Sequence, residues 1–152
     1  MSKEHKCASK ICRHKGLPVD ADNCIKTNIN YWHKDCYKQK ENLKMIIKLF
    51  SGYVACNKKM YADLQRVCRD IVLNKGIDSE LLLFGLKYYI NHKITLNYPA
   101  GLYYIIQNKD VIEAYHRNKL KQQNATFEIT TENSSDFTHK PIRTKGFADI
   151  LK

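Results

Sequence analysis

Four side chains near the start of the chain have the types and the spacing of metal ligands. A Cys-x4-Cys pair is followed, after a longer stretch, by His-x-x-Cys; the four residues are Cys7, Cys12, His33 and Cys36. Three thiolates and one imidazole match the donor set of a closed tetrahedral Cys3His zinc site. Other nearby side chains could replace Cys7 or Cys12, namely Cys24, His5 and His14. The sequence therefore predicts a zinc site within residues 5–36 and leaves part of the ligand set open.

The zinc ion is expected to have a structural role. A catalytic zinc keeps one open coordination position, often with a carboxylate base nearby, whereas four protein ligands close this site. Asp35 lies beside the ligands, but an Asp at the start of a helix more often caps the helix or interacts with its dipole. The sequence also contains no Walker loop, Gly-x-Ser-x-Gly, His-Glu-x-x-His or dinucleotide-binding motif. We therefore expect zinc to fold the head, residues 1–45, and we expect no enzymatic activity.

Disulfide formation is the alternative to metal binding for these cysteines. The first residues of the chain are polar and basic and lack the apolar segment of a secretory signal. A reducing, cytoplasmic environment is therefore expected, and it favours metal binding over disulfides. Cys56 and Cys68 lie further along the chain among apolar positions with helical spacing, and they are expected in the core.

A hairpin and a helix are expected to position the ligands. Leu17–Asp20 and Cys24–Thr27 are strand-like runs on either side of a turn-rich Ala-Asp-Asn, which predicts a β-hairpin. A helix is expected to begin at Asp35, because apolar residues then recur at helical spacing: Leu43, Ile46, Ile47, Phe50 and Val54. Two ligands would lie in a loop and two at the first turn of this helix.

Residues 46–122 are predicted to be helical. Gly76 is expected to end one helix and Asp78 to begin the next, while Pro99 suits the first turn of another helix that continues past a break near Asn108. Apolar residues at helical spacing support these helices: Met60, Leu64, Val67, Ile71, Leu82, Leu86, Tyr89, Ile90, Leu102, Ile105, Ile106, Ile112 and Tyr115. A region of this size can bury one modest core, so the head and the helices are expected to pack together.

Residues 123–152 are predicted to form a flexible linker that ends in a docking peptide. This segment is polar, rich in Thr, Asn and Ser, and poor in aliphatic residues. Phe147, Ile150 and Leu151 fall at i, i+3 and i+4, the spacing with which a short amphipathic helix binds a groove on another protein. The peptide could instead fold back onto its own protein or be a frayed end, and the sequence leaves these alternatives open.

Positive charge is concentrated in the head and in the helical region. The chain has 26 Lys and Arg against 15 Asp and Glu, a formal net charge of +11. A basic head around a zinc site suggests contacts with phosphates, although net charge also serves solubility. Because lysine predominates, the contact is expected to be with the DNA backbone rather than with base edges. The predicted contact residues are Lys6, Lys10, Arg13, Lys15, Lys26 and Lys34.

The order of ligands and elements resembles known zinc-binding proteins. Loop, hairpin and helix resemble a treble-clef zinc finger, and Trp32-His33-x-x-Cys36 resembles the second ligand pair in the first half of a LIM domain. The first pair differs, being Cys-x4-Cys rather than Cys-x2-Cys, and no second zinc module follows. As a whole, the chain resembles small zinc-finger proteins of unknown function encoded by phages and mobile elements of low-GC Gram-positive bacteria. The matching segments are Tyr31–Tyr37, Leu83–Ile90 and Gly101–Ile106.

These observations predict a mainly α fold. It would contain a small N-terminal treble-clef-like zinc finger, made of a β-hairpin and a helix, with four or five helices in all and a flexible C-terminal tail. Three parts are expected: the zinc-finger head at residues 1–45, a helical region packed against it at 46–122, and the linker with its docking peptide at 123–152. The resemblance places such a protein in the cytoplasm of a bacterial host cell.

The predicted function is that of a non-enzymatic zinc-finger DNA-binding protein, an accessory or regulatory factor in the replication or transcription of a phage or mobile element. The alternative is an inhibitor or adaptor that binds a host nucleic-acid-handling or defence machine through its basic face and C-terminal peptide. Both hypotheses include a protein partner for that peptide, and neither involves a membrane. The clustered charge around Cys7 and Cys12 favours DNA binding.

Overall fold

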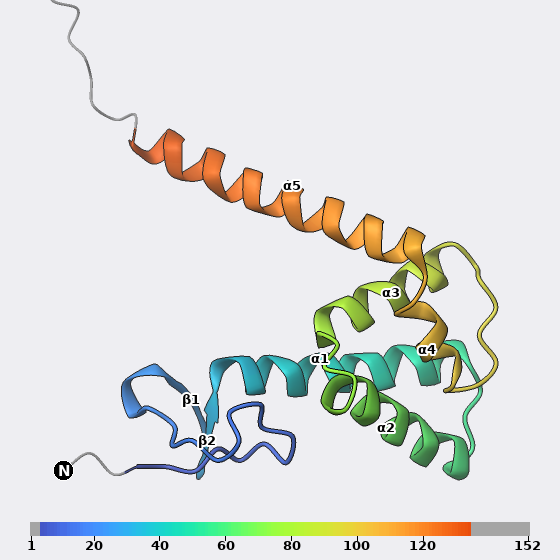
Figure 1. Cartoon of the computed structure of the whole chain (residues 1–152), viewed down its shortest axis with the longest axis horizontal. Coiled ribbons are helices and arrows are strands. Elements are labelled where there is room, and N and C mark those ends of the chain that lie inside the picture. Colours follow the sequence, from blue (N-terminus) through green and yellow to red (C-terminus); the bar gives the residue numbers. More distant parts are fainter. Residues whose placement is uncertain (1–3, 135–152) are drawn as a thin grey trace, which may run out of the picture. The chain divides into compact units, whose positions relative to one another are not determined.

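The structure is a computed structural model that describes residues 4–134, with side chains for residues 4–126. Regular structure in this range consists of five α-helices, one two-stranded antiparallel sheet and one short 3-10 helix (Figure 1). The elements in chain order are η1 (Ala21–Asn23), β1 (Cys24–Thr27), β2 (Asn30–His33), α1 (Lys34–Tyr53), α2 (Lys58–Leu73), α3 (Ser79–Asn91), α4 (Gly101–Ile105) and α5 (Lys109–Ser134). The predicted fold class, mainly α with a hairpin near the N-terminus, is confirmed.

The chain divides into two units, residues 1–115 and 116–152, and the boundary falls inside α5. The hairpin, the helices α1 to α4 and the first residues of α5 belong to the first unit. Within the described part of the chain, no helix is both long and apolar enough to cross a membrane.

The hairpin differs from the predicted one in its second strand. β1 was predicted, but it pairs with β2 and not with Leu17–Asp20; Cys24 lies opposite His33 and Thr27 opposite Asn30. The turn between the strands contains Asn28, whose φ of 47° lies in the left-handed region that Asn tolerates. The aromatic residues of β2 also favour a strand.

The segment before β1 is mostly irregular. The residues predicted as a turn form η1, and the Asp20 side chain accepts a hydrogen bond from the Asp22 backbone N–H. Of the predicted first strand, Val19 alone makes a bridge, and its partner is His5. Pro18 lies in the predicted strand and has no backbone N–H to donate to a neighbouring strand, which explains the error.

The helices follow the predicted apolar periodicity closely. α1 begins one residue before Asp35, and α3 begins after Asp78, whose side chain caps the Glu80 N–H at 3.0 Å. Gly76 has a φ of 64°, but it lies beyond the end of α2 at Leu73 and its C-cap. The predicted break near Asn108 separates α4 from α5, so the single interrupted helix is two helices.

One hydrophobic core joins α1, α2, α3 and α4. Its fully buried side chains include Ile46 and Phe50 of α1, Leu64 and Ile71 of α2, Leu82 and Leu86 of α3, and Leu102 and Ile105 of α4. α3 and α4 approach closely at Gly85, because a Cβ atom built there would collide with Ile105 Cγ2. The predicted core position of Cys68 is confirmed, since this side chain is 2% exposed.

α5 continues through residues that were predicted to be linker. The prediction of a flexible linker is wrong for residues 123–134, which are the last turns of α5. This stretch is polar, but from Lys109 to Ser134 the sequence has neither Gly nor Pro, so nothing in it ends a helix. The predicted docking residues Phe147, Ile150 and Leu151 lie outside the described residues.

Candidate metal centre and basic groove

Cys7 is held in place by backbone pairing on both sides of its segment. The Ala8 N–H donates to the Tyr31 carbonyl at 2.9 Å, and the Val19 N–H donates to the His5 carbonyl at 2.7 Å. The His5 ring stacks on the Tyr31 ring with centroids 3.6 Å apart. The chain before the first ligand is therefore attached to β2, the strand that ends at the third ligand, His33.

His33 and Cys36 meet where β2 passes directly into α1. His33 is the last residue of β2 and the N-cap of α1, and Cys36 is the third residue of that helix. Residues three apart at a helix start lie on the same side of the helix. The partial positive charge of the helix N-terminus also favours a thiolate at Cys36.

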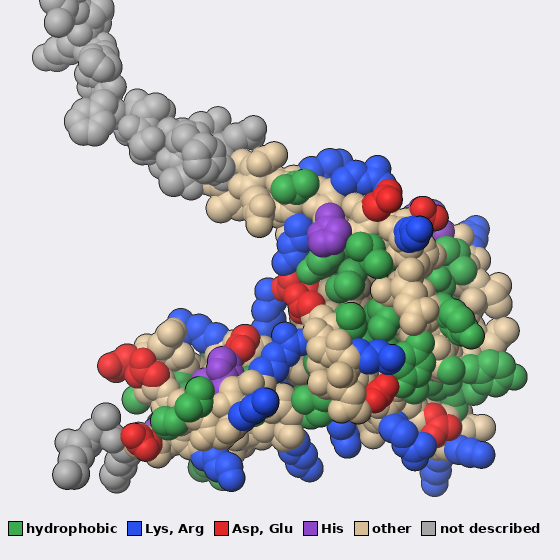
Figure 2. All heavy atoms as spheres, viewed as in Figure 1, with side chains coloured by type: hydrophobic (Ala, Val, Ile, Leu, Met, Phe, Trp, Pro, Cys, Tyr) green, Lys and Arg blue, Asp and Glu red, His purple; other side chains and the backbone are tan. Residues whose placement is uncertain are grey.

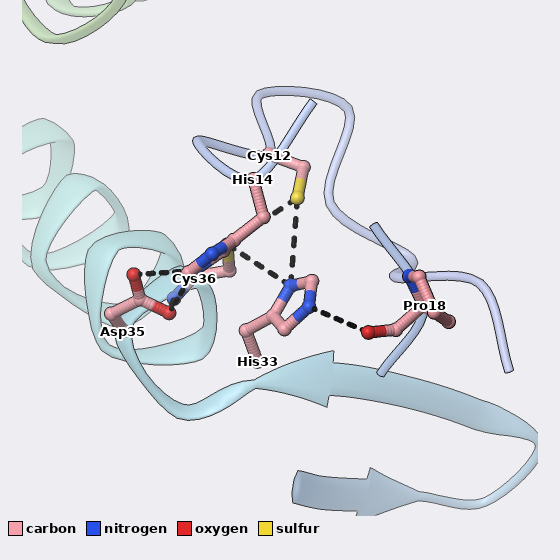
Figure 3. Close-up of polar contacts among 6 residues, drawn as sticks. All are labelled: Cys12, His14, Pro18, His33, Asp35 and Cys36. Atoms are coloured by element: carbon pink, nitrogen blue, oxygen red, sulfur yellow. Dashed lines mark hydrogen bonds and ion pairs between the residues drawn. The ribbon is translucent and has the colours of Figure 1, made fainter. Parts of the chain in front are cut away.

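The structure brings all four predicted ligands together. The ligand atoms of Cys7, Cys12, His33 and Cys36 lie within 4.8 Å of one another. Figure 3 shows the Cys12 and Cys36 sulfurs directed toward the His33 ring. The His33 Nδ1 atom is 3.5 Å from Cys12 Sγ and 3.8 Å from Cys36 Sγ, and the two sulfurs are 3.8 Å apart.

These separations match the edges of a tetrahedron around one metal ion. With metal–sulfur bonds of about 2.3 Å and a metal–nitrogen bond of about 2.0 to 2.1 Å, a regular tetrahedron has sulfur–sulfur edges of about 3.8 Å and sulfur–nitrogen edges of about 3.6 Å. The cluster of Cys7, Cys12, His33 and Cys36, called the metal cluster here, can thus hold a metal ion.

The contacts of the His33 ring suit metal binding through its Nδ1 atom. Its Nε2 atom lies 3.4 Å from the Pro18 carbonyl oxygen, as Figure 3 shows. A carbonyl can only accept a hydrogen bond, so this contact favours the tautomer with the proton on Nε2, which leaves the Nδ1 lone pair for a metal ion. Such a second contact is usual for a metal-binding His, since it fixes the ring and the tautomer.

Three sulfur atoms share a small, partly buried space. Cys36 is 1% exposed, and burial, together with the neighbouring thiols of Cys12 and Cys7, raises its pKa to about 12. A hydrogen bond from the Arg13 backbone acts in the opposite direction but is outweighed. Because the thiolates would repel one another here, a bound cation is what makes the deprotonated cluster favourable.

The alternative ligands have other partners. Cys24 Sγ donates to the Ala21 carbonyl, and His5 stacks on Tyr31. His14 Nε2 lies 2.8 and 2.9 Å from the two carboxylate oxygens of Asp35. His14, Asp35 and Cys36 also lie close enough to share a metal ion, but their set has one sulfur and is a less typical zinc site.

Asp35 lies in the first turn of α1, where its carboxylate accepts hydrogen bonds from neighbouring groups. One of its oxygens accepts the Cys36 N–H at 2.9 Å, besides the contacts with His14. Burial acts to raise the pKa of Asp35, but the hydrogen bond and charge of His14 and the Cys36 N–H together hold this pKa below its usual value. Asp35 is therefore an ionised partner of two neighbouring groups.

The predicted DNA-contact residues have different surroundings in the structure. Lys6, Lys15 and Lys34 are exposed, and the Lys26 ammonium lies 5.4 Å from the centre of the Tyr31 ring. The Arg13 guanidinium donates to the Ile77 carbonyl at 3.2 Å, so it links the head to the loop before α3. Lys10 borders a groove that sequence reasoning did not anticipate.

This groove lies between residues 8–11, α1 and α2, and has a volume of about 650 Å³. Its floor is apolar and includes Ile11, Leu43, Ile47 and Tyr61. Five cationic side chains border it: Lys10, Lys40, Lys44, Lys48 and Arg69, called the basic rim here. No Asp or Glu is among the described residues that line the groove.

Four members of the basic rim were missed, and one signal could have identified three of them. Lys40, Lys44 and Lys48 recur every fourth residue, which places them in one row along the predicted helix. In Figure 2, Lys and Arg side chains gather along the edge of the first unit where α1 and α2 lie. Arg69 joins them only through the packing of α2 against α1.

Comparisons with known protein families, with curated proteins and with solved structures find no match to this chain.

Proposed function

We propose that this is a non-enzymatic nucleic-acid-binding protein whose head is folded around one structural zinc ion. The observation that carries the proposal is the basic rim: five cations line one groove, and none of the described carboxylates lines it. Such a concentration of positive charge favours an anionic polymer, whose phosphates release bound counterions on contact.

Zinc is the metal that the donor set favours. Three thiolates and an imidazole suit zinc better than magnesium or calcium, which prefer oxygen ligands. The head has little apolar core of its own: among the described residues, its separate buried cluster consists of Cys7, Val19 and Cys36, with Cys12, Cys24 and Tyr31 partly buried against them. Zinc binding would supply the folding free energy that this small core lacks.

Four protein ligands complete a tetrahedral shell, which argues against catalysis at the metal. The nearby carboxylate of Asp35 is occupied by His14 and by the Cys36 N–H, so it has little freedom to act as a base. Both features favour a structural role for the ion.

The proposed zinc ion would also shape the groove. Residues 8–11 line one side of it, and the ligands Cys7 and Cys12 stand at the two ends of this segment. Lys10 of the rim lies between the ligands. Loss of zinc is therefore expected to release one wall of the groove and to weaken nucleic-acid binding.

The rim suits contact with the phosphate backbone. Four of its five members are lysines, which act as point charges and read base edges poorly. A role in the replication or transcription of a phage or mobile element is the part of the proposal that the resemblance supplies. The protein is proposed to act there as an accessory factor.

Substitution of the rim tests the proposal. The triple variant Lys40→Ala, Lys44→Ala, Lys48→Ala is expected to bind labelled DNA more weakly at every salt concentration and to reduce the salt slope by roughly two to three units. A matched control replaces Lys58, Lys59 and Lys87, which are exposed and do not line the groove. If the two variants bind equally, as measured by fluorescence anisotropy, the rim is not the contact surface.

A further inference from the structure

The floor of the groove is more apolar than phosphate binding requires. Ile11, Leu43 and Ile47 are half-buried, and the Tyr61 side chain is exposed at 43% although it belongs to an apolar patch. A ligand held by phosphates alone would leave this surface in water. The occupant should therefore present apolar surface and negative charge at the same time.

We propose that the groove binds single-stranded nucleic acid, with phosphates on the basic rim and one or two unpaired bases on the floor. A duplex keeps its bases stacked inside, whereas a single strand exposes their faces beside a charged backbone. The inference rests on the proposed function for the phosphate contacts and adds the class of nucleic acid.

The spacing of the rim suits a strand that runs along α1. Lys40, Lys44 and Lys48 lie on successive turns, about 6 Å apart along the helix axis. This interval is close to the separation of successive phosphates in an extended strand. Lys10 and Arg69 come from other segments of the wall, so cations stand on more than one side of the groove.

Tyr61 is the aromatic ring that can receive a base. Trp32 also lines the groove, but it is 9% exposed, and the Lys40 ammonium lies 4.7 Å from the centre of its ring. The Trp32 indole N–H donates to the Thr27 hydroxyl, which fixes the ring in the head. Tyr61 is more exposed, at 43%, so its ring is the one in the groove that a base can reach for stacking, an interaction that accepts any base.

The groove has room for this ligand. Its volume of about 650 Å³ falls within the range of roughly 300 to 1,000 Å³ that holds a drug-sized molecule. One or two nucleotides are of that size. The remaining nucleotides of a longer strand would interact with the exposed lysines outside the groove, without sequence preference.

Trp32 provides a direct test, because it is the one tryptophan of the chain and lines the groove. The zinc-loaded full chain is titrated with oligo(dT), oligo(U) and a DNA duplex at one salt concentration. Trp32 fluorescence excited near 295 nm and anisotropy of labelled strands are both recorded. We expect oligo(dT) to change Trp32 fluorescence and to bind at least about tenfold more tightly than the duplex.

Two variants separate the floor from the rim. Tyr61→Leu keeps an apolar side chain but removes the ring, and it should weaken single-strand binding by roughly fivefold or more while leaving duplex binding unchanged. The control Tyr98→Leu changes a tyrosine that is exposed at 68% and lies outside the groove, and it should change neither. Unchanged thermal midpoints show that both variants are folded.

The outcomes distinguish this inference from the proposed function. Equal binding of duplex and single strands, with no response to Tyr61→Leu, overturns the single-strand site and leaves phosphate binding intact. Absence of binding to any strand at low salt overturns both. If an acidic amphipathic peptide alone changes Trp32 fluorescence, the groove belongs to a protein partner and both proposals fail. A preference for oligo(dT) or oligo(U), lost in Tyr61→Leu, supports the inference and identifies the strand as DNA or RNA.

Discussion

At the scale of single residues, the metal cluster depends on side chains whose types were recognisable in the sequence. All four predicted ligands meet within 4.8 Å, although two come from a loop and two from the start of a helix. The types and the spacing of these residues were enough to predict the cluster, because three cysteines and a histidine with this spacing are typical of a zinc site. The choice against Cys24, His5 and His14 needed the structure, since all three lie in the same segment of the sequence.

The first prediction concerns Cys36, the most buried of the ligands. Cys36→Ser should strongly reduce the zinc content from about one ion per chain, because it removes a thiolate from the tetrahedral shell. Cys24→Ser is the matched control, since Cys24 Sγ bonds to the Ala21 carbonyl and lies outside the metal cluster. The zinc content of each protein is measured with a chromogenic chelator after a thiol reagent has released the metal. Equal zinc contents for Cys36→Ser and wild type would contradict the assignment of Cys36 as a ligand.

A second prediction concerns a pH-dependent contact between α2 and α4. Asp70 accepts hydrogen bonds from the Tyr103 hydroxyl at 2.7 Å and from the Asn74 amide at 2.6 Å. These two bonds lower the pKa of Asp70 from 3.8, while the bond to Asp70 and burial raise the pKa of Tyr103 from 10.0. The contact therefore stabilises the fold at neutral pH, and its contribution is lost as the pH falls through the lowered pKa of Asp70 or rises through the raised pKa of Tyr103.

Tyr103→Phe tests this contact without disturbing the metal cluster. The variant should unfold more easily than wild type at pH 7, and the difference between the two proteins should shrink as the pH falls from 3.8 through the lowered folded-state pKa of Asp70, because only below that pKa is Asp70 protonated in both the folded and the unfolded state. Acid also releases zinc, but this lowers the free energy of unfolding of both proteins by the same amount, so it does not change the difference between them. The free energies of unfolding of both proteins are measured by urea denaturation at several pH values. A difference between them that does not change with pH would contradict a contribution from the Asp70–Tyr103 contact.

At the scale of elements, the helices were predictable and the second strand was not. α1, α2 and α3 follow apolar residues at helical spacing with recognisable capping residues, such as Asp78. β2 was missed although its two aromatic residues favour a strand, because the two-residue turn that contains Asn28 was not recognised. Residues 123–134 were predicted to be a linker because they are polar. They continue α5 instead, since this stretch contains no Gly or Pro that would end a helix.

Gly85 supplies the prediction at this scale. Gly85→Ala should lower the free energy of unfolding by about 1 to 3 kcal/mol, because the added methyl group collides with the Ile105 side chain where α3 meets α4. Gly52→Ala is the control, since Gly52 lies in α1 and an added Cβ meets nothing within 4 Å. That variant should be neutral or more stable by up to about 1 kcal/mol. Equal destabilisation of both variants, in chemical denaturation, would contradict the close approach of the helices.

At the scale of the whole molecule, α1 links the metal cluster to the core. Cys36 is in its first turn, whereas Ile46 and Phe50 are fully buried among α2, α3 and α4. The groove forms where α1 meets α2 and the segment between the first two ligands. No local pattern in the sequence could show it, because its rim combines three segments that only the packed fold brings together.

This arrangement predicts a partial effect of zinc removal. A chelator should disorder the head but leave much of the helical signal in circular dichroism, because the core of α1 to α4 is separate from the cluster of Cys7, Val19 and Cys36. Amide hydrogen exchange should accelerate in residues 5–33 and remain slow in α3. Complete loss of helical signal on chelation would show that the core cannot persist without the metal.

The most direct test of the account is nucleic-acid binding by one sample before zinc removal, after it and after zinc is restored. Anisotropy of a labelled oligonucleotide at low salt would be followed through the three steps. We expect tight, salt-sensitive binding that weakens at least about tenfold on chelation and returns with zinc, because the metal ligands lie at both ends of the groove wall that contains Lys10. Binding that is absent throughout, or that is unchanged by zinc removal, would contradict the account.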